Sequence, residues 1–139
     1  MGDTREAVAA AAEMWLAKAD GDCRAARALL GADVPRAVVC FHAQQAVEKA
    51  LKAVLIALQV EPQRTHAIAV LVRTLGKMGF DLPAELEPIE LLTMYAVEFR
   101  YPGEVTEPDE QETSEAVSLA QATVSWAQRN VTKVAAAST

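Results

Sequence analysis

The segment from Val38 to Gln59 constrains the fold more than any other, because its apolar residues recur every three or four positions. An apolar surface that covers more than half of a helix has to be buried by several neighbouring elements. We therefore predict that this segment is the central helix of a bundle. Gln44 is the one polar residue among the apolar positions. The apolar arc consists of Ala43, Ala46, Val47, Ala50, Leu51, Val54, Leu55 and Leu58.

Glycine, proline and N-capping residues divide the rest of the chain into four further predicted helices. The first contains Asp20-Gly21-Asp22, where we expect a bend or a loosened turn, and Gly31 ends it. Strand patterns are missing and the connections are short, so the predicted fold is all-α, an antiparallel four- or five-helix up-and-down bundle. The predicted helices span 5–30, 35–59, 66–78 with Thr65 as N-cap, 83 or 88 to 101, and 109–129 with a capping box of Asp109 and Glu112.

Composition agrees with close-packed helices. Of 139 residues, 28 are alanine and only 5% are aromatic, which disfavours a β-sandwich. We expect one helical domain over residues 5–131 and a flexible tail over 132–139. No apolar run approaches the roughly 18 residues of a membrane span. Cys23 and Cys40 lack metal-binding or redox spacing, so we expect buried free thiols in a cytoplasmic protein.

The net charge of −6 is unevenly distributed along the chain. Residues 85–115 contain ten acidic residues and a single base, Arg100, whereas the remainder is mildly basic. The acidic balance disfavours broad nucleic-acid binding, and an exposed polar face would account for most of the acidic stretch. Arg100, however, falls on the apolar arc of its predicted helix. It therefore needs a carboxylate, helix carbonyls or a ligand phosphate as partner, and Tyr101 beside it offers a hydroxyl and a stacking face.

A polar track follows the central helix, formed by His42, Gln45 and Lys49 at positions i, i+3 and i+7. A solvated face, or one covered by another subunit, would explain it; the alternative is a donor-rich surface for an anion such as a nucleotide phosphate. Neither His42 nor His66 has a glutamate three residues before it, and the glycines form no phosphate-binding motif. We therefore predict no metal site, no cofactor and no catalytic residue.

Three motifs carry a resemblance to a known family. The stretch 41–53 (FHAQQAVEKALKA), the segment Arg64-Thr65-His66 and the tripeptide Arg100-Tyr101-Pro102 resemble, in order and spacing, the motifs of HEPN domains (higher eukaryotes and prokaryotes nucleotide-binding). Trp15-Leu16 with Ala19 and Asp22 is similar to the first helix of that family. The resemblance covers about residues 12–130. It implies a helical bundle, usually a homodimer, with a polar cleft at or near the dimer interface.

The same resemblance implies a role, and it has one departure. Many prokaryotic HEPN proteins pair with minimal nucleotidyltransferases in toxin–antitoxin modules, and others are metal-independent ribonucleases with an Arg-x(4–6)-His motif. Here Val105, Thr106 and Glu107 occupy the positions where that histidine would stand, and no histidine follows Arg100. In addition, Ala67, directly after His66, stands where many relatives carry an acidic residue. The acid/base group of the ribonuclease mechanism is therefore absent from its expected place.

We consequently expect a non-catalytic nucleotide-binding homodimer that partners a nucleotidyltransferase. Arg100 would bind phosphate, Tyr101 would stack or form a hydrogen bond, and further contacts would come from His42, Gln45, Lys49 and His66. One alternative is a ribonuclease toxin with a rearranged active site that uses His42 or His66. Another is a purely structural interaction bundle.

Overall fold

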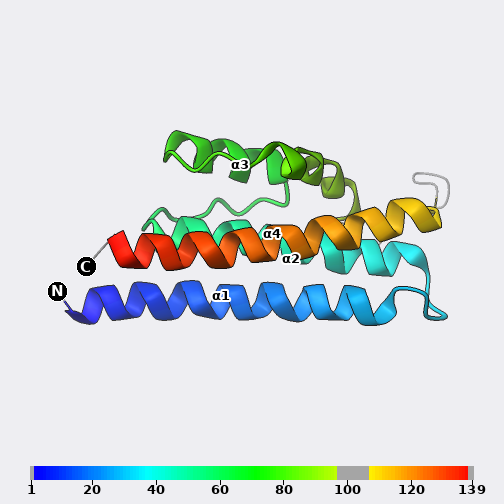
Figure 1. Cartoon of the computed structure of the whole chain (residues 1–139), viewed down its shortest axis with the longest axis horizontal. Coiled ribbons are helices and arrows are strands. Elements are labelled where there is room, and N and C mark those ends of the chain that lie inside the picture. The colour runs from blue at the N-terminus through cyan, green and yellow to red at the C-terminus, as the bar shows by residue number, and fades with distance from the viewer. Residues whose placement is uncertain (1, 97–106, 138–139) are drawn as a thin grey trace.

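Three long helices lie side by side, and two short ones lie on one side of them (Figure 1). The computed structural model describes residues 2–96 and 107–137. Those ranges are helical and contain no strand, which confirms the all-α prediction. None of the helices described there is long and apolar enough to cross a membrane. The elements are α1 (Gly2–Leu29), α2 (Arg36–Ala57), α3 (Ile68–Lys77), the 3-10 helix η1 (Ala84–Tyr95) and α4 (Glu110–Ala137).

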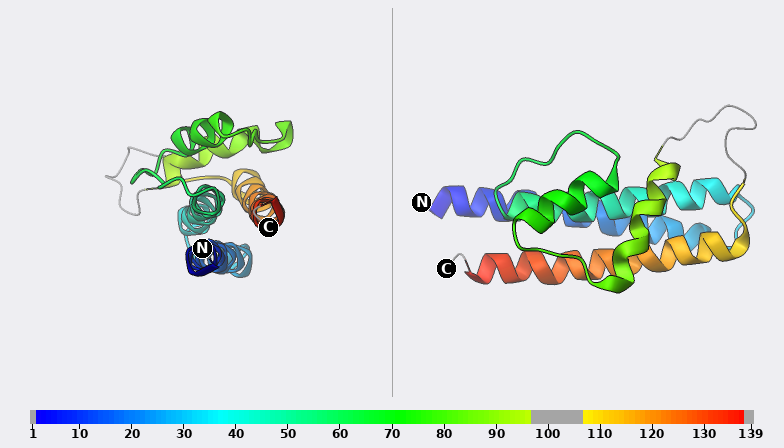
Figure 2. Two further views of the ribbon diagram at one scale, coloured as in Figure 1. Left: turned by 90° about the vertical axis from the view of Figure 1, so that its left-hand side faces the viewer. Right: turned by 90° about the horizontal axis from the view of Figure 1, so that it is seen from above.

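The connection through α3 and η1 determines the directions of the long helices. It carries the chain back along the bundle, so that α4 begins beside the beginning of α2 (Figure 2). Two contacts hold these starts together: the backbone N–H of Ala37 donates to the Glu107 carboxylate at 3.2 Å, and Arg36 pairs with Glu110 at 3.4 Å. Helix α1 therefore runs antiparallel to both α2 and α4 (Figure 1).

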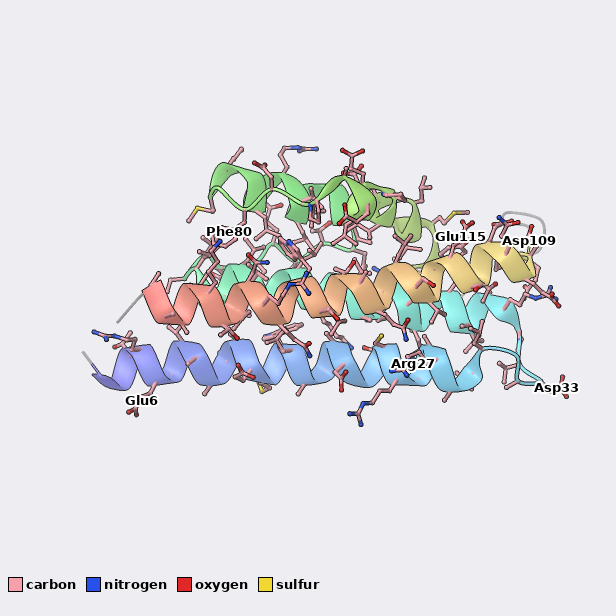
Figure 3. All side chains as sticks on the ribbon, viewed as in Figure 1. Glu6, Arg27, Asp33, Phe80, Asp109 and Glu115 are labelled. Carbon is pink, nitrogen blue, oxygen red and sulfur yellow. The ribbon has the colours of Figure 1, made fainter. Side chains whose placement is uncertain are left out.

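Helix α2 is the central helix that the sequence predicted. It contacts every other element, and all but Leu58 of the predicted apolar arc are buried. Gln44, the polar residue among them, is also completely buried. Charged side chains such as Glu6, Asp33 and Glu115 lie instead on the outer surface (Figure 3). The apolar face of α2, with Gln44 as its one polar residue, therefore lies inside the core.

Helix α1 is continuous through Asp20-Gly21-Asp22, so the predicted bend is wrong. Gly21 lies on the exposed side, and an ion pair of 2.9 Å between Arg24 and Asp20 spans the same turn. A solvent-facing glycine weakens a helix by about 1 kcal/mol without ending it, and the buried face of α1 compensates. Gly31 and Gly79 do follow helix ends with positive φ angles of 83° and 84°, as predicted.

Two predicted helices differ from the structure. Helix α3 starts at Ile68 rather than His66, and Thr65 is not its N-cap, because the Thr65 hydroxyl accepts the N–H of Ala67 in the connection before it. The next segment is the 3-10 helix η1, not an α-helix. Pro88 lies inside it and has no N–H to donate, which disfavours a regular α-helical ladder.

The last helix begins as predicted and ends later. Asp109 accepts the N–H of Glu112 at 2.7 Å, which confirms the N-cap. Helix α4 continues to Ala137, well past the predicted end at Arg129, because Val131 still packs into the core. The division into a domain over 5–131 and a tail over 132–139 stays a prediction.

A buried junction joins η1 to α2 and α4. Cys40 of α2 donates a long hydrogen bond of 3.8 Å from its thiol to the hydroxyl of Thr113 in α4, and the phenol of Tyr95 in η1 lies beside it. Cys23 and Cys40 are both buried free thiols, as predicted. Burial raises the pKa of the Cys40 thiol, and burial together with neighbouring Cys40 and Glu112 raises the pKa of Tyr95 to about 12.

This junction predicts a loss of stability at alkaline pH. The unfolded chain releases the Tyr95 proton near pH 10, whereas the folded chain retains it to about pH 12, so rising pH favours unfolding across this interval. We expect urea unfolding at pH 9 and pH 11.5 to show a loss that is larger, on the order of 1–2 kcal/mol, in the wild type than in Tyr95→Phe. Equal losses in the two proteins would contradict this account.

Candidate functional site

The structure places four of the six predicted site residues in one region. His42, Gln45 and Lys49 lie on α2, and His66 lies in the connection from α2 to α3. Arg100 and Tyr101 lie outside the described residues. The arrangement of the first four can therefore be built from contacts, whereas the roles predicted for Arg100 and Tyr101 stay predictions.

Asp22 of α1 contacts both ends of the polar track. One carboxylate oxygen contacts Nδ1 of His42 at 3.1 Å, and the other contacts Nζ of Lys49 at 2.5 Å. The Asp22 side chain is only 16% exposed. The track is therefore packed against α1 rather than fully solvated. Asp22 was not predicted as a site residue. It follows Trp15 and Ala19 at helical spacing, on the face of α1 that contacts α2.

Glu48 holds a second set of contacts, one turn along α2 from Gln44. Its side chain is 5% exposed, accepts from Nδ1 of His66 at 2.8 Å and pairs with Lys52 at 3.7 Å. Glutamate is a charged residue that is ordinarily exposed on a helix, so the burial of Glu48 was not predicted. Its position one turn after Gln44, the buried polar residue, was the signal that could have found it. His66 itself is 64% exposed, so its ring projects beyond the buried carboxylate.

Two neighbouring glutamines of α2 pair with each other. Gln45 donates from Nε2 to the carbonyl oxygen of Gln44 at 2.7 Å. The Nε2 of Gln44 is buried and has no hydrogen-bond partner within the described residues. We call the whole set the α2 polar cluster, which consists of Asp22, His42, Gln44, Gln45, Glu48, Lys49, Lys52 and His66.

The α2 polar cluster is electrically balanced. Its two carboxylates are matched by the two lysines, so the formal charge sums to zero when the imidazoles are neutral. A carboxylate can only accept hydrogen bonds, so we assign the proton of both His42 and His66 to Nδ1. In the neutral form this leaves Nε2 of each ring as an acceptor that faces away from its carboxylate. Lys52 also lies 5.9 Å from the Trp15 ring centroid, which adds a cation–π contact.

Such an arrangement permits two kinds of chemistry. A carboxylate that orients an imidazole is the geometry of a general base, and the exposed His66 ring could reach a substrate. The same groups can bind a ligand through neutral hydrogen bonds without reaction. No three potential metal ligands gather among the residues the structure describes, so those residues offer no ready-made metal site.

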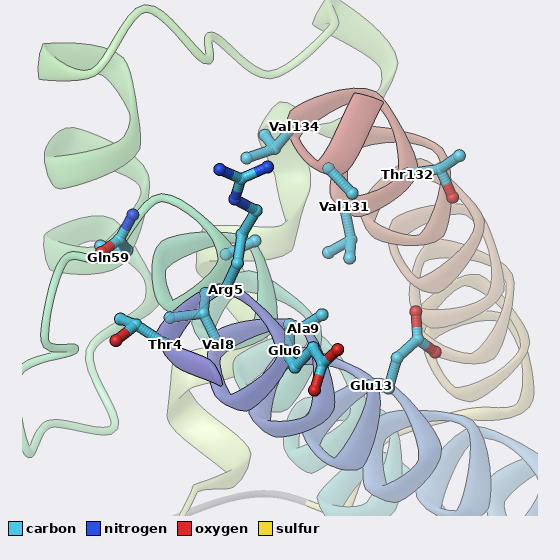
Figure 4. Close-up of a pocket in the computed structure, with 13 residues that line it drawn as sticks. Thr4, Arg5, Glu6, Val8, Ala9, Glu13, Gln59, Val131, Thr132 and Val134 are labelled. Carbon is cyan, nitrogen blue, oxygen red and sulfur yellow. The ribbon is translucent and has the colours of Figure 1, made fainter. Parts of the chain in front are cut away.

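Two hollows lie elsewhere in the described structure. One, of about 590 Å³, is formed where the first turns of α1 meet the last turns of α2 and α4 (Figure 4). Its walls are mostly alanine and valine, with Arg5, Glu6 and Glu13 among the lining residues. The second, of about 530 Å³, lies at the other end, near Arg36 and Glu107. No member of the α2 polar cluster lines either hollow, so the four described site residues are not grouped around them.

The buried pairing in the α2 polar cluster is expected to stabilise the protein. We predict a coupling free energy of about 1–3 kcal/mol between Asp22→Asn and Lys49→Gln in a double-mutant cycle measured by urea unfolding. The matched control is the exposed pair Asp20→Asn and Arg24→Gln, for which we expect less than about 0.5 kcal/mol because both side chains are solvated. A coupling free energy that is similar in the two cycles would contradict the prediction, because Asp22 and Lys49 would then stabilise the protein no more than an exposed ion pair.

Comparison with known proteins places this arrangement in context. The family model for the HEPN domain matches residues 12–131. A crystal structure of TT1696 from Thermus thermophilus is 31% identical, with a TM-score of 0.74 over 86% of this chain and 97% of that one. ST0689, an archaeal HEPN homologue, is 24% identical, with a TM-score of 0.69 over the same shares, and supports the fold. None of the curated proteins matches the sequence.

Proposed function

The chain belongs to the HEPN family, and we propose that it is a non-catalytic member that binds a nucleotide or a nucleotidylated group. The observation that carries this proposal is the α2 polar cluster. It lies largely within the stretch 41–53 and projects hydrogen-bonding groups from a helix whose other side is locked in the core. Buried carboxylates fix the imidazoles before any ligand arrives, which lowers the entropic cost of binding.

Each of the predicted residues has a part in the proposal. Arg100 would bind a phosphate and Tyr101 would stack on or donate to the ligand, while His42, Gln45, Lys49 and His66 form the described part of the site. Guanidinium is suited to phosphate because its N–H groups match two oxygens at once. The acidic balance of the chain opposes the binding of long nucleic acids but not of a small anion that contacts one arginine.

Assembly and partners form the second part of the proposal. We expect a cytoplasmic homodimer that pairs with a minimal nucleotidyltransferase in a toxin–antitoxin-like module. Support for the partner comes from the family motifs alone. Support for an interface comes also from η1, where Leu91 is 71% exposed and Met94 is 47% exposed, so that apolar surface is available for another chain to cover.

Calorimetric titration of ATP and GTP tests the ligand proposal. We expect binding by the wild type and an affinity about 10- to 100-fold lower in Arg100→Ala, because a charge-assisted hydrogen bond contributes about 1.5–3 kcal/mol. Arg73→Ala is the matched control, since Arg73 is an exposed arginine on α3 that does not belong to the cluster. Absence of binding by the wild type would exclude the proposal.

A ribonuclease is the second candidate, and the pairing of His66 with Glu48 is the observation that favours it. The His66 ring, oriented by Glu48, could act as the acid/base group, because no histidine stands at the expected place after Arg100. Bulk RNA incubated with the protein in EDTA distinguishes the two functions. The main proposal predicts no cleavage, whereas cleavage that is lost in His66→Ala or His42→Ala would establish the ribonuclease instead.

A further inference from the structure

We infer that the α2 polar cluster binds the uncharged nucleobase of the ligand and not its phosphates. This inference rests on the proposed function, because it divides one nucleotide between two parts of the same site. It changes the roles of His42 and Lys49, which the sequence predicted as donors to a phosphate. The reasons are the charges of the cluster and the directions of its hydrogen bonds.

Both lysines of the cluster are already occupied. Lys49 is paired with Asp22 and Lys52 with Glu48, and both carboxylates are largely buried. A phosphate that withdrew either lysine would leave a buried carboxylate without its cation, which is strongly unfavourable. The same carboxylates would repel the phosphate itself. A neutral ligand group avoids both costs.

The imidazoles also favour a base over a phosphate. Because Nδ1 of His42 and His66 donates to a carboxylate, the Nε2 that remains is an acceptor in the neutral ring. A phosphate offers almost only acceptor oxygens, so it does not match Nε2 of a neutral ring. The edge of a nucleobase carries both N–H donors and acceptors, and an N–H donor of the base matches such a ring nitrogen.

Gln45 supplies the complementary contacts, and Gln44 positions it. The carbonyl oxygen of Gln44 accepts one N–H of Gln45, and within the described residues this is the only hydrogen bond of the Gln45 side chain. Its carbonyl oxygen and second N–H are therefore available to a ligand. Phe41 meets His42 edge to face, with ring centroids 5.8 Å apart, which adds aromatic surface beside these groups.

Separate probes for the two halves of a nucleotide test this inference. Adenosine, guanosine, cytidine and uridine carry the base without phosphate, whereas inorganic tripolyphosphate carries the phosphates without a base. We would titrate each probe, and ATP and GTP, into the wild type, Gln45→Ala, His66→Ala and Arg100→Ala, with Arg73→Ala as control. Circular dichroism checks that each variant is folded, and the exposed His66 and half-buried Gln45 provide two independent tests.

The expected result is a crossed pattern. Gln45→Ala and His66→Ala should each lower the affinity for at least one nucleoside, and for its triphosphate, by about 5- to 10-fold, and leave tripolyphosphate binding unchanged. Arg100→Ala should do the reverse. Weaker tripolyphosphate binding in Gln45→Ala or His66→Ala, with nucleoside binding unaffected, would overturn the inference while nucleotide binding itself survived. Failure of the wild type to bind any nucleotide would overturn both.

Discussion

The structure depends on the pairing of two largely buried carboxylates, Asp22 and Glu48, with the polar groups of α2. Helix α2 is enclosed on most sides, yet it carries lysines, a histidine and glutamines that need partners away from bulk water. Asp22 supplies them from α1, and Glu48 joins α2 to the connection that leads into α3. These contacts specify how α1 and the connection lie against the central helix, in addition to the apolar core.

In our proposal the same pairing determines which groups of a ligand the α2 polar cluster can bind. A cluster that neutralises its own charges attracts phosphate weakly, whatever the number of lysines in its sequence. Its useful property is orientation: each imidazole is held by a carboxylate, and Gln45 is held by Gln44. Specificity for a base would then come from neutral hydrogen bonds, and affinity for phosphates from Arg100.

Local features of the sequence predicted the fold well. These features depend only on residues near in sequence, so periodicity and capping patterns predict them. They are the apolar arc of α2, the glycines after α1 and α3, and the Asp109 cap. The continuity of α1 at Gly21 and the burial of Glu48 depend on contacts with distant segments, and no local pattern contains them. For the candidate site, helical spacing placed His42, Gln45 and Lys49 on one side of α2 but could not show that Asp22 contacts two of them.

The protonation of the two imidazoles tests the central claim most directly. The chain contains only two histidines, so a long-range proton–nitrogen correlation spectrum of the uniformly labelled protein reports on His42 and His66 alone. Our account predicts that both neutral rings carry the proton on Nδ1 and leave Nε2 unprotonated, and that Asp22→Asn and Glu48→Gln each disturb only the ring they contact. Neutral rings with the proton on Nε2 would contradict it, because the carboxylates would then not orient the histidines.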